Sequence, residues 1–212
     1  MHGHGTVAPG PRFRQAARVP SPTRRSWTRA ELESFRDAAV PDLLPASGLR
    51  LLFVGINPGL WTAATQTHFA HPVNRFYPAL LEAGIIERPI DPAAGMTDED
   101  RAHLTARGIG ITNVVHRATA RADELTADEL RLGGQQLVVL VDRVRPRVVA
   151  LAGITAYRTA FDRRKAVLGR QDETLGGAEL WVVPNPSGLN AHETVSSLAT
   201  AYAAAARAAG VI

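Results

Sequence analysis

Short apolar runs alternate with longer amphipathic stretches along most of the chain. Apolar, β-branched runs predict four strands, at residues 50–54, 109–115, 146–152 and 179–183. Helical periodicity and capping residues predict helices at residues 28–39, 74–83, 97–107, 126–143, 155–161 and 192–209. Strands that alternate with helices are typical of a mostly parallel sheet covered on both faces, so the pattern predicts an α/β fold.

Two stretches depart from this alternation. Residues 1–25 are rich in proline, glycine and arginine and lack apolar periodicity, which indicates a disordered basic arm. Residues 163–177 form a charged, glycine-containing connection that we expect to be mobile. The length of 212 residues suits one domain with a substantial core, which we place at residues 26–212.

The formal net charge of +4 hides an uneven distribution of charge. Residues 1–30 contain six arginines and no acidic residue, whereas the remaining residues hold 18 basic and 20 acidic side chains. The body of the chain is therefore slightly acidic. A polyanionic partner is indicated by the arm alone, and charge by itself is weak evidence for one.

Several function classes are excluded by what the chain lacks. It has no cysteine, so disulfides, thiolate zinc sites, cysteine-ligated iron–sulfur clusters and a cysteine nucleophile are ruled out. His71 and His116 are isolated and lack metal-ligand spacing, so we expect neither a metal nor another cofactor. No apolar run reaches the ~18–20 residues that span a bilayer and no signal peptide is evident, so we expect a cytoplasmic protein without a membrane partner.

The most informative residues form two loops, Gly55–Leu60 (GINPGL) and Asn185–Asn190 (NPSGLN). Each loop directly follows a predicted strand, and ligands of α/β sheets bind at the carboxyl ends of strands. Both loops combine a rigid proline, a glycine that permits close backbone approach and an amide side chain. The two loops therefore predict a single site, although Asn57 and Asn185 could instead form local Asx turns.

A third segment, Phe69–Tyr77, lies between the two loops in sequence. Phe76 and Leu80 have helical spacing and are expected in the core, whereas Phe69 falls in the loop before the helix. Phe69 could be a stacking platform for a planar ligand or an anchor for the loop. The chain contains no P-loop, no GxGxxG fingerprint and no GxSxG motif, which disfavours nucleotide binding and serine hydrolase chemistry.

Taken in order, Gly55–Leu60, Phe69–Phe76 and Asn185–Leu189 resemble the uracil-DNA glycosylase superfamily, in particular its mismatch-specific branch, which includes thymine-DNA glycosylases. The resemblance covers about residues 45–208. It implies a three-layer α/β/α domain around a short four-stranded, mostly parallel sheet. It also implies a monomeric, monofunctional enzyme of base excision repair. This enzyme would flip uracil out of G·U mispairs in double-stranded DNA and hydrolyse the N-glycosidic bond.

The resemblance also implies roles for individual residues. Asn57 falls where the family holds the attacking water, and Phe69 falls on the aromatic residue that stacks on the flipped base. Asn185 occupies a position that other branches fill with histidine. The other implied positions are Ile56 in the pocket lining, Thr62 near the pyrimidine C5 edge, and the DNA-contacting loop Ser187, Gly188, Leu189 and Asn190, in which Gly188 and Leu189 form the wedge.

The chain departs from the family pattern at two points. The bacterial pattern continues Ser-Arg after the wedge leucine, whereas this chain has Asn190-Ala191, so an arginine contact to the opposite strand is lost or supplied elsewhere. Asn113 lies towards the end of the strand predicted at residues 109–115, at a position that varies in the branch and can carry an acid. A non-catalytic module that binds distorted DNA is the main alternative, and a small-molecule α/β hydrolase is a weaker one.

Overall fold

The computed structural model describes Met1 and residues 26–212, so the rest of the predicted basic arm lies outside the described residues. The strands are β1 (Leu51–Gly55), β2 (Ile109–Asn113), β3 (Val148–Ala152), β4 (Gly169–Leu175) and β5 (Ala178–Val183). The α-helices are α1 (Arg29–Glu33), α2 (Leu60–Thr65), α3 (Phe76–Glu82), α4 (Asp98–Ala106), α5 (Ala127–Val144), α6 (Ile154–Ala160) and α7 (Val195–Ala209). Short 3-10 helices lie at Pro92–Ala94 and Ala122–Glu124.

The strands form one sheet in the order β2-β1-β3-β5-β4, in which the first four run parallel and β4 is antiparallel to β5. The mostly parallel α/β fold is thus confirmed, but the prediction of four strands is wrong because the sheet has five. The stretch predicted to be a mobile connection contains β4. Gly176 and Gly177, both with positive φ, close a two-residue hairpin that pairs β4 with β5. The alternating exposure of β4 suits a polar edge strand.

The helix ends follow their capping residues. Thr97 and Thr126 cap α4 and α5 as predicted, each in a complete capping box. The first helix is shorter than predicted, because the chain turns after Glu33 and reaches a positive φ of 64° at Asp37, whose amide donates to Ala118 O. Helix α2 was not predicted, since six residues directly after a loop show no helical periodicity.

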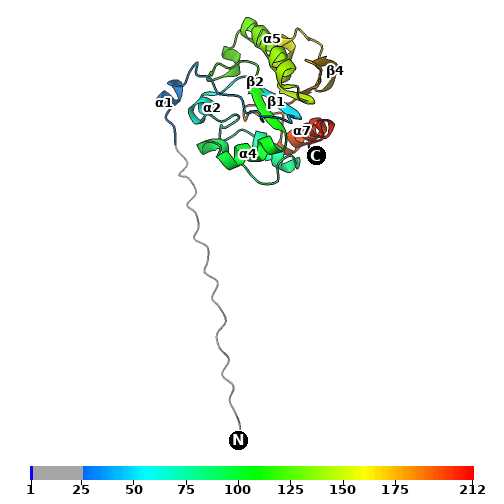
Figure 1. The fold of residues 1–212 in the computed structure, drawn as a ribbon. Helices are drawn as coiled ribbons and strands as arrows, with labels where there is room; N and C mark the ends of the chain where they lie inside the picture. Colours follow the sequence, from blue (N-terminus) through cyan, green and yellow to red (C-terminus); the bar gives the residue numbers. More distant parts are fainter. Residues whose placement is uncertain (2–25) are drawn as a thin grey trace.

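Helices cover both faces of the sheet, giving three layers (Figure 1). Leu51 and Phe53 of β1 point to the layer that contains α3, α4 and α7, and this core includes Phe76 and Tyr202. Leu52 and Val54 point to the opposite layer, where α5 and α6 pack. Because successive side chains of a strand face opposite sides, a fully apolar strand of this kind must be covered twice. Because β2, β1, β3 and β5 run parallel, their carboxyl ends lie at the same edge of the sheet.

Candidate functional site

A cavity of about 820 Å³ lies at the carboxyl ends of the parallel strands. All of the predicted site residues line it, namely Ile56, Asn57, Thr62, Phe69, Asn185, Ser187, Gly188, Leu189 and Asn190. The loop after β1 and the loop after β5 are brought together across β3, which lies between them in the sheet. Gly153, which follows β3 with φ 133°, permits this approach, because a Cβ there would lie 3.1 Å from Ile56 Cδ1.

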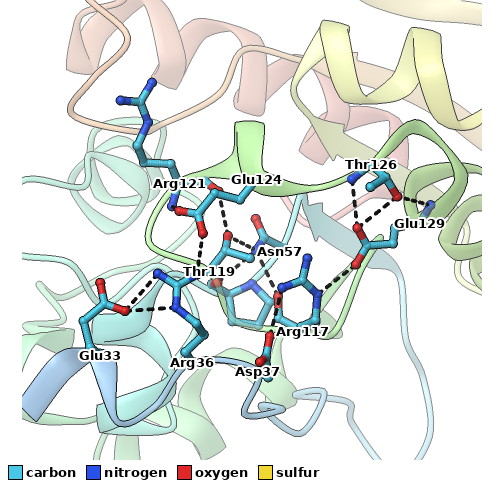
Figure 2. Close-up of polar contacts among 11 residues, drawn as sticks. Glu33, Arg36, Asp37, Asn57, Arg117, Thr119, Arg121, Glu124, Thr126 and Glu129 are labelled. Atoms are coloured by element: carbon cyan, nitrogen blue, oxygen red, sulfur yellow. Dashed lines mark hydrogen bonds and ion pairs between the residues drawn. The ribbon is translucent and has the colours of Figure 1, made fainter.

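The amide of Asn57 is held in one orientation by protein acceptors (Figure 2). Its Nδ2 lies 3.0 Å from Arg117 O, 2.8 Å from Thr119 Oγ1 and 3.1 Å from Pro58 O. The Thr119 hydroxyl donates its one hydrogen to Arg121 O at 2.7 Å, so towards Asn57 it can only accept. The Oδ1 atom of Asn57 has no hydrogen-bond partner among the described residues and is left as an acceptor for a ligand or a water.

The segment that supplies these acceptors is itself anchored by ion pairs. Arg117 binds Glu129 at 2.8 Å and Asp37 at 2.9 Å, and Figure 2 shows these pairs beside Asn57. The hydrogen bond from Arg117 holds the pKa of Glu129 at about 2, below its usual range, so the pair stays charged at neutral pH. The Thr119 amide also donates to Pro58 O at 3.1 Å, which ties this segment to the loop after β1.

Phe69 is fixed in the cavity wall by an unusual backbone conformation and a stacked neighbour. Its φ is 56°, and its ring stacks on Phe76 with centroids 4.1 Å apart and planes 23° apart. A Cβ at position 55 would lie 3.2 Å from Phe69 Cζ and 2.4 Å from Asn113 Oδ1, so only glycine fits there. Phe69 is thus both an anchor in the core and a surface of the cavity.

Asn113 is a site residue to which the sequence motifs assigned no role. It ends β2, is 4 % exposed, lines the cavity, and its Nδ2 lies 3.2 Å from His68 Nδ1. The signal was present in the sequence, since a polar residue at the end of a buried strand of an α/β sheet lies at the ligand edge. Its neighbour His68 carried no signal, because the pairing depends on a loop that folds back over β2.

The loop after β5 is stiffened by its own side chains. Asn185 Oδ1 accepts from the Ser187 amide at 3.0 Å, an Asx turn, and Asn190 Nδ2 donates to Asn185 O at 3.1 Å. The guanidinium of Arg75 donates to the carbonyl oxygens of Ser187, Asn190 and Glu193. This loop holds Leu189 with 85 % of its surface exposed.

Most of the chain matches a known protein family. Residues 41–207 match the family model described as the uracil DNA glycosylase superfamily. The chain belongs to the uracil DNA glycosylase superfamily. Membership implies a DNA-binding hydrolase, a DNA glycosylase that acts on uracil. The match covers the whole of the sheet and every residue that lines the cavity.

The site of this superfamily member is built from amides and backbone rather than from carboxylates. Among the described residues, the carboxylates that line the cavity are Asp123 and Glu193. Asp123 is paired with Arg121 at 2.5 Å, and Glu193 accepts from Ser197 Oγ. The described residues of the cavity therefore do not include a pair of unbound carboxylates of the kind that sugar glycosidases use.

Among the described residues, no group of three or more histidine, aspartate or glutamate side chains is placed to hold a metal ion. No helix of the same part of the chain is long and apolar enough to cross a membrane.

Proposed function

We propose that this protein is a monofunctional uracil-DNA glycosylase of the mismatch-specific branch, which removes uracil from G·U mispairs for base excision repair. The observation that carries the proposal is the orientation of Asn57. Three acceptors surround its Nδ2, its Oδ1 has no hydrogen-bond partner among the described residues, and Asn57 lines the cavity. An acceptor held in this way can bind one hydrogen of a water and direct a lone pair of that water at the sugar.

Hydrolysis by this site needs no strong base. The C1′–N1 bond breaks with its electron pair moving to uracil, which leaves as an anion with charge spread onto its two carbonyl oxygens. The water held by Asn57 bonds to C1′ of the oxocarbenium-like sugar, and the proton it releases neutralises the departing base. Asn185 supports this step, because its Oδ1 is bound to the Ser187 amide and its Nδ2 hydrogens can stabilise the developing charge.

The proposed binding of the flipped base uses the remaining cavity residues. Phe69 stacks on the base, worth roughly 1–3 kcal/mol by comparison with single-strand binding proteins. Asn113 Oδ1 accepts from the N3–H of uracil, a group that cytosine lacks. Thr62, which is 6 % exposed on α2, lies near the C5 edge, and Ile56 completes the apolar wall.

Flipping is supported by Leu189. Extruding a nucleotide costs a few kcal/mol and costs least at a mispair. Leu189 is exposed in the free protein, and burying it in the vacated space would return about 1.5–3 kcal/mol. These contributions nearly balance the cost for a wobble pair and fall short for a sound pair. Selectivity for mispairs follows, with the preference for guanine opposite relaxed because Asn190-Ala191 replaces Ser-Arg.

The test is Asn57→Ala. We expect binding to a G·U duplex to persist while the single-turnover rate at saturating protein falls about 10²–10³-fold, the range for one preorganised polar group. Gln135→Ala, which truncates an exposed amide on α5, is the control and should cleave normally. A folded Asn57→Ala variant that cleaves at the wild-type rate would refute the assignment, and wild-type protein that binds the duplex without cleaving it would favour the non-catalytic module.

A further inference from the structure

His68 is the buried neighbour of Asn113, and both of its ring nitrogens are engaged. Nε2 lies 3.0 Å from Pro41 O, and Nδ1 lies 3.2 Å from Asn113 Nδ2. His68 is 5 % exposed, and its own carbonyl accepts from the hydroxyl of Tyr77 at 3.0 Å. The ring therefore sits at a defined place behind the cavity wall.

These partners determine the tautomer of His68. A carbonyl oxygen can only accept, so Nε2 must carry the hydrogen that it donates to Pro41 O. Burial lowers the pKa of His68, reinforced by His116 and Arg101 and opposed by Pro41 O and Asp42, so the ring is neutral at neutral pH. In the neutral ring Nδ1 holds a lone pair, and it can face only a donor.

The lone pair in turn decides which end of the Asn113 amide faces the cavity. A side-chain amide has nearly the same shape after a half-turn, so packing alone does not distinguish its oxygen from its nitrogen. With Nδ2 drawn to His68, the oxygen lies over Gly55 at the edge of the Phe69 ring. Among the described residues, His68 is the only side chain that forms a hydrogen bond with the Asn113 amide.

We propose that His68 is a positioning residue for base recognition, which holds Asn113 so that an acceptor rather than a donor meets the N3 edge of the flipped base. The inference rests on the proposed function and names its specificity determinant. Uracil and thymine present a hydrogen at N3, whereas cytosine presents a lone pair there. A reversed amide would set N–H against N3–H and weaken uracil binding in the transition state.

Two substitutions separate this role from a structural one. The amide of an asparagine side chain overlays Nδ1 of histidine, and the amide of a glutamine side chain overlays Nε2. His68→Asn can thus keep an acceptor for Asn113 while losing the bond to Pro41, and His68→Gln can do the reverse. We expect His68→Gln to lower the single-turnover rate on uracil about tenfold and His68→Asn to stay within about twofold of wild type.

The test is completed by introducing His68→Gln and His68→Asn separately into the Asn113→Ala variant. If His68 acts through Asn113, both substitutions should then leave the rate of Asn113→Ala unchanged. Equal losses in the two His68 variants, or a loss by His68→Gln that persists without Asn113, would assign His68 a purely structural role and overturn the proposal.

A nuclear magnetic resonance measurement decides the pairing without reference to activity. The ¹⁵N spectrum of wild-type protein should show His68 protonated at Nε2 and unprotonated at Nδ1. The Asn113 side-chain signal, identified by its absence in Asn113→Ala, should shift in His68→Gln more than in His68→Asn. A proton on Nδ1 would overturn the proposal. If instead these spectra appear as expected and wild-type protein leaves uracil in place, the proposed function fails and the pairing stands.

Discussion

At the scale of single residues, the amides of Asn57, Asn113 and Asn185 each have one end bound by the protein and the other end without a partner among the described residues. Nδ2 of Asn57 meets three acceptors, Nδ2 of Asn113 meets His68, and Oδ1 of Asn185 meets the Ser187 amide. The cavity therefore offers two acceptors and one donor at set places without any net charge from these residues. Such preorganisation lets a neutral site discriminate between bases and between ground and transition states.

Thr119 should be needed for the orientation of Asn57. Thr119→Val removes the hydroxyl that accepts from Asn57 Nδ2, whereas Thr119→Ser keeps it. We expect the single-turnover rate on a G·U duplex to fall about tenfold for the valine variant and by less than about threefold for the serine variant, since one positioning hydrogen bond is lost in the first only. Valine matches threonine in shape, so equal rates for the two variants would show that Asn57 is held without Thr119.

At the scale of elements, the loop after β5 differs from an ordinary surface loop in its internal support. Arg75, on the segment before α3, donates to three carbonyl oxygens of the loop, and the Arg75 amide donates to Pro186 O. Gly188 packs so closely that a Cβ there would lie 2.8 Å from Val73 O. A rigid loop that exposes a leucine loses little entropy when that leucine enters a duplex, which favours the wedge assignment.

Leu189→Ala should therefore impair flipping more than chemistry. We expect the single-turnover rate on a G·U duplex to fall about tenfold to a hundredfold, with a much smaller loss on single-stranded uracil DNA, where no gap needs filling. Leu132→Ala, the same change at a 56 % exposed position on α5, is the matched control. Equal losses on the two substrates would reject the wedge role of Leu189.

At the scale of the whole molecule, charge is divided between the arm and the body. Residues 1–25 hold five arginines and no acid, while the residues after position 30 carry a small net negative charge. The body therefore gives little general attraction for DNA phosphates, and the arm is the natural source of it.

Replacing the five arginines of residues 1–25 with glutamine should weaken duplex binding and flatten its dependence on salt. Each lost phosphate contact lowers the slope of log K against log salt by about 0.9, so the slope should fall by up to about 4.5. The single-turnover rate at saturating protein should stay at the wild-type value because the cavity is untouched. An unchanged slope would mean that these arginines do not contact DNA.

The sequence by itself determined the alternation of strands and helices. A parallel sheet covered on both faces needs fully apolar strands, and the helices that cover it must be amphipathic. The capping residues Thr97 and Thr126 placed two helix starts correctly, since such caps act within four residues. The sequence also predicted that two loops would lie together, and both line the cavity, as the carboxyl ends of parallel strands must share one edge. The edge strand β4 was missed although the Gly176-Gly177 turn signalled it, because its polar residues resemble those of a loop.

Only the tertiary structure decided which way the amides of Asn57 and Asn113 point. Two of the three partners of Asn57 lie 60 and 62 positions away along the chain, and the partner of Asn113 lies 45 positions away. No local pattern encodes such a pairing, because it depends on the sheet order that sets β1 beside β2. Sequence thus specified the residue types that line the cavity, while the fold selected which end of Asn57 and of Asn113 is left unbound, since hydrogen bonds depend on direction and distance in space.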